Sequence, residues 1–236
     1  MDCGIYQERI MRSGKKLLFV VLSLAAALPI DAQTPAQWRD SLAVINRQIA
    51  TRPYSSDLHL RKAAINLELQ QWEYAAEEYG HVLEREPKNP AALFYRAYAN
   101  THLRRYDLAR RDYEDFIAVV PRNMEAMLGL AHVCIKLQRT SEAMDHLNRL
   151  VELYPDSAVV YASRASLERD LRSYDAALYD WTQACRLAPD NTDFVISRTD
   201  ILLSLGRKDE ARGELDALVR RGVPRGALRE WYDRCR

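Results

Sequence analysis

The chain has few of the residues that mark several large classes of protein. Only eight glycines occur among 236 residues, which excludes collagen and argues against glycine-rich barrels and propellers. An excess of one charge is also missing, because 34 basic residues stand against 33 acidic ones. The formal charge of +1 gives no electrostatic reason to expect nucleic acid as a partner. With 48% hydrophobic residues the chain is expected to fold, and the scarcity of glycine favours helices.

Sequence signatures of common enzymes are lacking as well. The chain contains no Gly-x-x-x-x-Gly-Lys loop, no Gly-x-Ser-x-Gly elbow and no His-Glu-x-x-His pair. No histidine stands four residues from another histidine or from a cysteine, so metal-ligand spacing on a helix is absent. Acidic residues such as Glu78 and Asp112 fit solvated helix faces better than catalytic pairs. We therefore expect no catalytic residue, no cofactor and no metal site.

The longest apolar run is too short to span a membrane as an ordinary helix. Residues 17–30 form a run of fourteen, whereas a spanning helix needs about 20 apolar residues. A basic cluster at residues 12–16 precedes the run, and Ala32 follows at a plausible cleavage position. Residues 1–32 are thus predicted to be a signal peptide cleaved after Ala32. The mature chain would be periplasmic or secreted and would not insert into a membrane.

Two alternatives stay open at this end of the chain. Residues 17–30 would instead act as an uncleaved anchor if no peptidase cut the chain. Met11 precedes the basic cluster directly, so either Met1 or Met11 is the true start, with an upstream extension in the first case. Cleavage after Ala32 would leave thirty basic and thirty acidic residues, and the mature chain would carry no formal net charge.

The prolines reveal an internal repeat. Successive prolines are 34 residues apart, four times in a row, and such a period indicates a repeat architecture. The series consists of Pro53, Pro87, Pro121, Pro155 and Pro189. Just beyond each turn stands a favoured helix N-cap residue: Ser55, Asn89, Asn123, Ser157 and Asn191. The period therefore carries both a stop signal and a start signal for helices.

Small and large side chains keep the same period. Small residues let two helices approach closely, and large ones fill the space beside the contact. The first small series is Ala75, Ala109, Ala143, Ala177 and Ala211, and the second is Ala63, Ala97, Ala131, Ala165 and Thr199. The large series is Tyr79, Tyr113, Leu147, Trp181 and Leu215. These series predict paired helices that pack along one seam.

This pattern resembles the tetratricopeptide repeat family, whose 34-residue unit carries aromatic, small and proline positions in a fixed order. The best-matching units contain Ala97, Tyr106, Ala109, Tyr113, Phe116 and Pro121, and Tyr161, Ala165, Tyr174, Ala177, Trp181 and Pro189. His59 departs from the pattern at a leading aromatic position and suggests a worn first repeat. The resemblance implies an all-α, right-handed superhelical solenoid of antiparallel helix pairs, with about twelve helices.

The repeat phase divides the mature chain into five units between two caps. Residues 33–55 are expected to form an N-terminal capping helix, and residues 225–236 a C-terminal one. The units themselves span residues 56–224, as 56–89, 90–123, 124–157, 158–191 and 192–224. Cys134 falls at a packing position, whereas Cys185 and Cys235 either pair or stay free thiols.

The resemblance also implies where a partner would bind. In that family the first helix of each unit lines a concave groove that holds a segment of a partner protein. Carried over by phase, the predicted groove residues are Phe94, Tyr98, His102, Leu128, His132, Lys136 and Arg169. Phe94, Tyr98 and His102 share one helix face, but aromatic residues at this spacing also pack between units. The chaperone-tail clamp of the family is not expected, since Leu60 and Ala64 occupy its polar positions.

These observations favour an exported, non-enzymatic module that binds a protein or peptide partner. Two other interpretations remain. The chain would serve as an envelope scaffold if it oligomerised or docked through its caps or convex face. It would be a membrane-anchored adaptor if the N-terminal segment stayed uncleaved.

Overall fold

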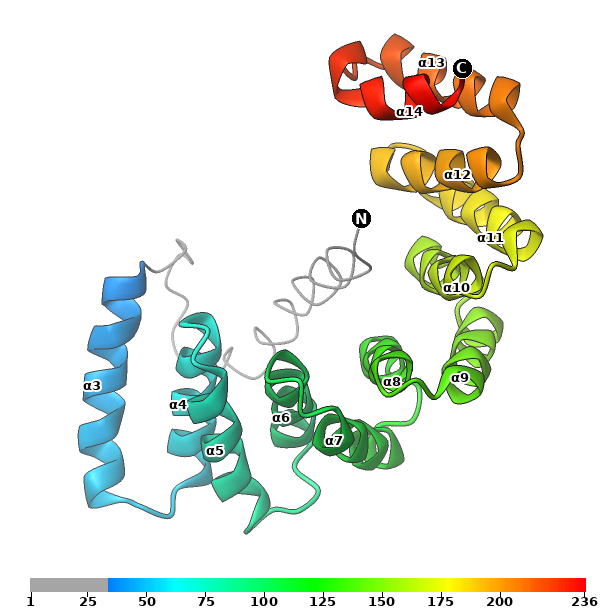
Figure 1. Ribbon diagram of the computed structural model, residues 1–236. Helices are drawn as coiled ribbons and strands as arrows, with labels where there is room; N and C mark the ends of the chain where they lie inside the picture. The colour runs from blue at the N-terminus through cyan, green and yellow to red at the C-terminus, as the bar shows by residue number, and fades with distance from the viewer. Residues whose placement is uncertain (1–33) are drawn as a thin grey trace. The chain divides into compact units, whose positions relative to one another are not determined.

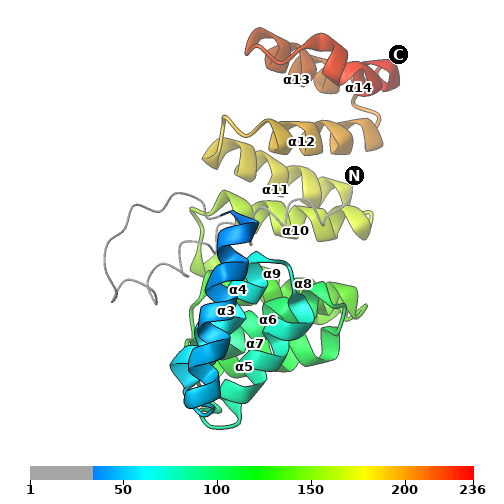
Figure 2. The same ribbon diagram turned by 90° about the vertical axis from the view of Figure 1, so that its left-hand side faces the viewer.

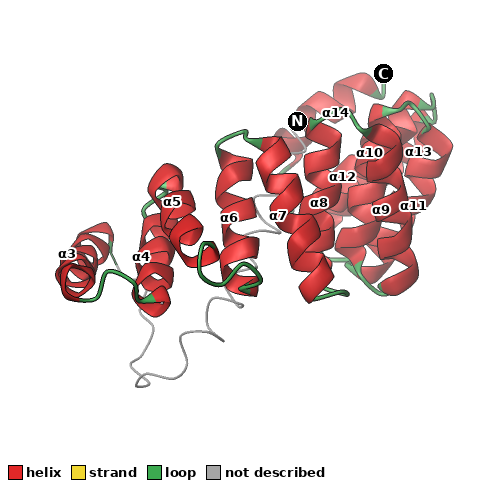
Figure 3. Cartoon of the chain, turned by 90° about the horizontal axis from the view of Figure 1, so that it is seen from below, coloured by secondary structure: helices red, strands yellow, loops and turns green. Residues whose placement is uncertain are grey.

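A computed structural model of the protein describes residues 34–236, and every regular element within them is a helix. The signal peptide predicted for residues 1–32 lies outside the described residues. The described chain contains twelve α-helices and one 3-10 helix, with loops between them and no strand (Figure 3). The all-α class and the number of helices expected from the repeat are confirmed.

The helices follow one another in pairs. The bounds are α3 Pro35–Thr51, α4 Ser56–Glu68, α5 Trp72–Leu83, α6 Pro90–His102, α7 Tyr106–Val119, α8 Met124–Lys136, α9 Thr140–Leu153, α10 Ala158–Asp170, α11 Tyr174–Leu187, α12 Thr192–Ser204, α13 Lys208–Arg220, η1 Arg225–Leu228 and α14 Arg229–Arg234. Each pair from α4–α5 to α12–α13 falls inside one 34-residue period, and we call its members the first and second helix of a repeat.

The chain forms two compact units, one ending at Ala143 and the other beginning at Met144. In the first unit each helix from α3 to α8 packs against the next (Figure 1). In the second unit α10, α11, α12 and α13 are stacked in order, and α14 covers α12 and α13 (Figure 2). The boundary falls inside α9, so the two units are joined by a helix and not by a proline- or glycine-rich linker.

Helix starts follow from the predicted N-cap residues. The side chain of Asn89 accepts a hydrogen bond from the amide of Ala92 at 3.0 Å, and Asn123 does the same for Ala126 at 2.8 Å. These bonds satisfy amides that the first turn of a helix leaves without partners. Ser55 and Asn191 cap α4 and α12 in the same way, and Ser157 occupies the N-cap position of α10.

The core runs along the seam that the sequence predicts. Every residue of the two small series is at most 1% exposed, and every residue of the large series at most 2%. At one contact the helices approach so closely that only glycine fits. A Cβ atom on Gly129 in α8 would stand 2.6 Å from Cζ of Tyr113 in α7. The small residues therefore set the distance between helices, as expected from close packing.

The turn inside each repeat adopts a left-handed backbone conformation at the same position. Glycine takes this conformation without strain, whereas other residues pay for the contact between Cβ and the backbone. Gly206 fills the position in the fifth repeat with φ of 74°. In the first four repeats the position holds Gln70, Arg104, Gln138 and Arg172, with φ between 56° and 60°.

Candidate functional site

The structure places the predicted groove residues on the first helix of three repeats. Phe94, Tyr98 and His102 lie in α6, and Leu128, His132 and Lys136 lie in α8, all within the first unit. Arg169 lies in α10, which belongs to the second unit. The first unit therefore contains six of the seven residues, and the site is described there.

Two of the six residues belong to the core. Phe94 is 7% exposed, and its ring meets the rings of Tyr95, Tyr113 and Phe116 at centroid distances between 5.2 and 6.0 Å. Leu128 is 6% exposed. Both side chains therefore pack between helices. For Phe94 the sequence was compatible with either a groove position or a packing position. Tyr98, His102 and His132 are half-buried, and Lys136 is exposed.

Three rings form a cluster on the first unit, which we call the Trp72 cluster: Trp72, Tyr98 and His102. The ring of Trp72 stacks on that of His102 at 4.0 Å between centroids, with 6° between planes. Tyr98 meets both edge-on, at 5.8 Å from Trp72 and 4.6 Å from His102. The residues predicted for the groove from the sequence did not include Trp72. It lies at the start of α5, one repeat before α6, and the 34-residue phase alone could not show that it reaches His102.

His132 extends this surface with an uncharged ring. Burial, followed by the charges of Lys136 and His102, lowers the pKa of His132 to about 4. The imidazole is consequently neutral at neutral pH and offers one N–H donor and one acceptor. Its Nδ1 is buried and has no hydrogen-bond partner among the described residues.

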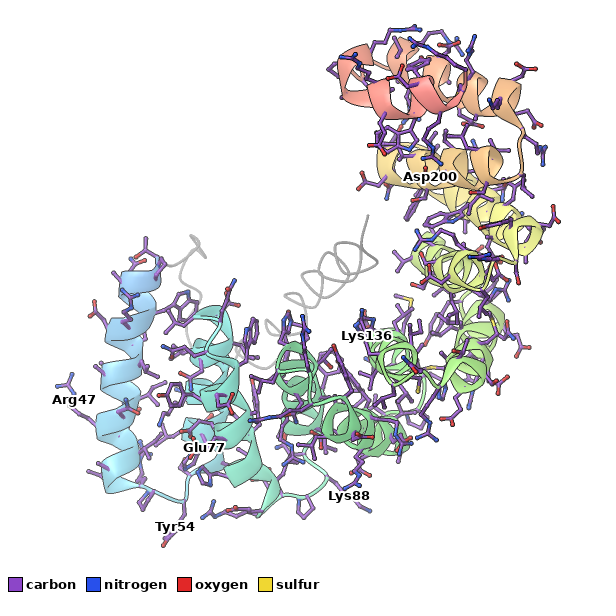
Figure 4. The ribbon with its side chains drawn as sticks, in the orientation of Figure 1. Arg47, Tyr54, Glu77, Lys88, Lys136 and Asp200 are labelled. Carbon is purple, nitrogen blue, oxygen red and sulfur yellow. The ribbon has the colours of Figure 1, made fainter. Side chains whose placement is uncertain are left out.

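Lys136 follows His132 by one helical turn and carries the positive charge of this surface. Figure 4 shows its side chain extending outward from α8. None of the ion pairs found between described residues includes Lys136. Its ammonium group can therefore meet an anionic group without giving up an internal partner. The rings, His132 and Lys136 together offer an apolar contact area beside one cation.

Arg169 is differently placed. Its Nε and Nη2 both donate to Oδ1 of Asp170, at 3.1 and 2.8 Å. The neighbouring carboxylate thus already takes up hydrogen-bonding capacity of the guanidinium group. Arg169 is half-buried in the second unit, and its groove role stays a prediction.

A second periodic feature, missed by the sequence reasoning, joins the two helices of most repeats. A basic residue on the first helix pairs with an acid sixteen positions later on the second, and we call this series the ion-pair ladder. Its members are Lys62–Glu78, Arg96–Asp112, Arg164–Asp180 and Arg198–Glu214, with nitrogen–oxygen distances of 2.5 or 2.6 Å. In the third repeat the first position holds the apolar Leu130.

The ladder corrects one sequence prediction. Glu78 and Asp112 were expected on solvated faces, but they are 6% and 4% exposed. Burial is tolerated because each carboxylate has a cationic partner: Lys62 at 2.6 Å from Glu78, and Arg96 through two bonds to Asp112. The acids therefore tie helices together instead of facing water.

His59 also has a defined structural place. Its Nδ1 lies 2.5 Å from Oε2 of Glu78, and its Nε2 lies 2.9 Å from the carbonyl oxygen of Pro53. The residue is buried, and its two bonds join α4 to α5 and to the turn before α4. The departure at this position is thus a polar anchor for the first repeat.

The cysteines and titratable clusters show no assembled reactive centre within residues 34–236. Cys134, Cys185 and Cys235 are all buried free thiols, so the structure does not contain the alternative bridge between the last two. Burial raises the pKa of Cys134 and of Cys185, which disfavours their thiolates. In the same part of the chain no group of three or more potential ligands stands in position to hold a metal ion. No described helix is long and apolar enough to cross a bilayer.

Antiparallel helix pairs with a 34-residue period define a helical-repeat protein of the kind that presents surfaces to other proteins. A sequence profile of the tetratricopeptide repeat family matches residues 60–113, 102–158 and 163–233. These matches cover most of the chain, and the protein belongs to the tetratricopeptide repeat family. The resemblance inferred from the proline and alanine phases is confirmed.

Similar proteins share the repeats to different extents. The TPR repeat-containing thioredoxin TDX of Arabidopsis thaliana is 35% identical over 77 residues, which make up 33% of this chain and 20% of the relative. The match thus spans one fifth of that protein. The PilF structure from Pseudomonas aeruginosa covers 98% of this chain and is itself covered to 96%, at 15% identity and a TM-score of 0.65.

A further structural neighbour is YrrB, described as a TPR protein with an unusual peptide-binding site. It is 17% identical, covers 73% of this chain, is covered to 89% and gives a TM-score of 0.58. At such identities the two structural neighbours show a shared fold and nothing further.

Proposed function

We propose that the protein is an exported, non-enzymatic interaction module that binds a segment of a protein partner on the first unit. The binding surface consists of the Trp72 cluster with His132 and Lys136. The observation that carries the proposal is the stack of Trp72 on His102, half-buried next to Tyr98 and not sealed in the core. Aromatic rings held in this way are the usual anchors of protein interfaces.

The chemistry of the surface favours a partner segment with an apolar or aromatic side chain and a nearby carboxylate. The ring faces provide apolar contact, while Lys136 supplies a charge-assisted bond to the carboxylate. His132 adds a neutral donor and acceptor, because its pKa of about 4 keeps the ring uncharged at neutral pH. The peptide-binding site named for YrrB supports the idea that this fold accommodates peptides.

Affinity capture with groove variants tests the binding proposal. Tyr98→Ala and Lys136→Glu are each immobilised and exposed to envelope extract beside the wild type. Matched controls change the same residue types elsewhere on the first unit: Tyr74→Ala, at an exposed tyrosine, and Lys88→Glu, at an exposed lysine in the loop before α6 (Figure 4).

A partner retained by the wild type and both controls, but reduced about tenfold or more by both groove variants, is the expected result. Circular dichroism verifies that all variants remain helical. Equal recovery of that partner by the wild type and the groove variants would contradict the assignment of the surface.

Export is tested separately, at the N-terminus of the protein purified from cells. We propose cleavage after Ala32, in which case sequencing starts at Gln33. The basic cluster and the fourteen-residue apolar run support this proposal. A protein that retains residues 17–30 and sediments with membranes would point to the anchored adaptor instead.

A further inference from the structure

The second unit contains a buried carboxylate with an unusual neighbour. Asp180 in α11 is 1% exposed and accepts two hydrogen bonds from Arg164 in α10, from Nε at 2.6 Å and from Nη2 at 2.9 Å. The remaining Nη1 of Arg164 donates to Oδ1 of Asn148 in α9 at 3.0 Å. This arrangement stabilises the negative charge on Asp180.

Glu168 stands one helical turn after Arg164 and meets the same carboxylate. Its side chain lies close enough to Asp180 for the two carboxyl groups to interact, and its buried Oε2 has no hydrogen-bond partner among the described residues. Two ionised carboxylates are both acceptors, so a bond between them requires one proton. Because both oxygens of Asp180 already accept hydrogen bonds from Arg164, the proton belongs on Glu168.

The second repeat has an amide at the equivalent position. Asn100 lies two periods before Glu168, and Asp112 lies two periods before Asp180. There Nδ2 of Asn100 donates to Oδ2 of Asp112 at 3.4 Å, beside the bidentate pair with Arg96. An amide donates at every pH, whereas a carboxyl group donates only when protonated. The fourth repeat therefore has a titratable donor where the second repeat has a permanent one.

The surroundings place the titration of Glu168 near neutrality. Burial, followed by the charge of Asp180, raises its pKa to about 7, and Arg164 acts in the opposite direction. The charged neighbour on α11 is Asp180, the charged neighbour on α10 is Arg164, and the polar group brought from α9 to this network is the uncharged Asn148.

We propose that Glu168 and Asp180 share a single proton, and that its loss as the pH rises towards and through neutrality loosens the packing of α10 against α11. This proposal goes beyond partner binding and concerns the stability of the second unit. At pH values between the ordinary pKa of a glutamate and the raised pKa of Glu168, the folded chain keeps this proton, whereas the unfolded chain has lost it. Folding is consequently favoured at the acidic end of this window and becomes weaker as the pH rises.

Urea unfolding of the full chain between pH 5 and pH 8 tests the proposal. Glu168→Gln supplies a permanent donor, as Asn100 does, and Glu152→Gln is the control because Glu152 is an exposed glutamate of the same unit. From pH 5 to pH 7 the folding equilibrium of the wild type should fall relative to Glu168→Gln, at most about tenfold per pH unit. Glu152→Gln should follow the wild type. Parallel pH profiles for the wild type and Glu168→Gln would overturn the proposal.

A direct titration of Glu168 in the wild type tests the proposal even if a variant folds poorly. In the wild type, carbon-13 signals of the glutamate carboxyl groups, assigned by comparison with Glu168→Asp or Glu168→Gln, report each midpoint. A midpoint for Glu168 more than one pH unit above those of exposed glutamates supports the shared proton. A midpoint among the exposed glutamates contradicts it. Installing the pair in the second repeat by Asn100→Glu should add the same loss of stability between pH 5 and pH 7 there, and the absence of any new pH dependence would count against the mechanism.

Discussion

The indole ring of Trp72 lies parallel to the imidazole ring of His102, 4.0 Å away between centroids. The contact joins α5 of one repeat to α6 of the next, because Trp72 begins α5 and His102 ends α6. Stacking of this kind orients the His102 ring and leaves Tyr98 against its edge. The shape of the proposed binding surface thus depends on a contact between repeats.

Replacing Trp72 separates ring stacking from simple apolar bulk. Trp72→Leu should lower the free energy of unfolding by about 1 kcal/mol beyond the loss of buried area, since it removes two ring–ring contacts. Trp72→Phe keeps a ring and should lose less. Urea unfolding at neutral pH measures both. Equal stability of the two variants would show that the stack contributes nothing specific.

His132 predicts a loss of stability in acid. Burial, Lys136 and His102 lower its pKa to about 4, so the folded chain resists protonation of this ring. Its contribution is complete above the ordinary histidine pKa of about 6.5 and declines as the pH falls towards 4. The stability of His132→Gln should therefore fall less than that of the wild type from pH 7 to pH 4.5.

His81→Gln is the matching control for this experiment, since His81 is a more exposed histidine of the same unit. Its melting temperature should decline with acid as the wild type does. If the melting temperature of His132→Gln falls with acid as much as those of the wild type and His81→Gln, His132 is not buried as a neutral ring.

The ion-pair ladder predicts unequal costs for acidic residues. Asp112→Ala should destabilise the first unit by about 3 kcal/mol, because Arg96 is left without its partner at a site where the carboxylate is 4% exposed. Glu73→Ala removes an exposed pair with Arg105 and should cost less than about 1 kcal/mol. Denaturant titration distinguishes them, and similar losses would mean that burial does not govern these pairs.

Two helical glycines predict effects of opposite sign. Gly129→Ala places a Cβ against the ring of Tyr113 and should cost about 1–3 kcal/mol through overpacking. Gly213→Ala meets nothing within 4 Å and should stabilise α13 by about 0.5–1 kcal/mol through helix propensity. Thermal unfolding of both variants checks the pair. A neutral Gly129→Ala would show that Tyr113 moves aside freely.

The sequence predicted the helix pairs well because each signal was local and repeated. A proline in the turn after a helix prevents the helix from continuing, and Asn89 caps α6 by accepting a bond from the nearby amide of Ala92. The alanine series predicted the seam for a similar reason, since a small residue at each crossing satisfies the same steric demand. Five copies of each signal made the period visible without any knowledge of tertiary contacts.

The site was harder to predict, because exposure depends on which helices meet. Phe94 and Tyr98 are one turn apart on α6, yet the first is in the core and the second is half-buried. Glu78 was taken for a surface acid beside Glu77, although His59 and Lys62 approach it from α4. The sixteen-residue spacing of the ladder was present in the sequence. Charges alternate so often on amphipathic helices that pairing becomes evident only when the two helices are in place.

The left-handed turns inside the repeats have a practical consequence. Gln70, Arg104, Gln138 and Arg172 each hold a backbone conformation that glycine adopts without strain, as Gly206 does in the fifth repeat. Glycine at these four turns would relieve that strain without replacing any residue of the Trp72 cluster or of the ion-pair ladder. Such a background would keep damaging substitutions folded, so that a loss of partner binding could be separated from a loss of structure. These four turns are therefore suitable positions for stabilising the protein while its binding surfaces are tested by mutation.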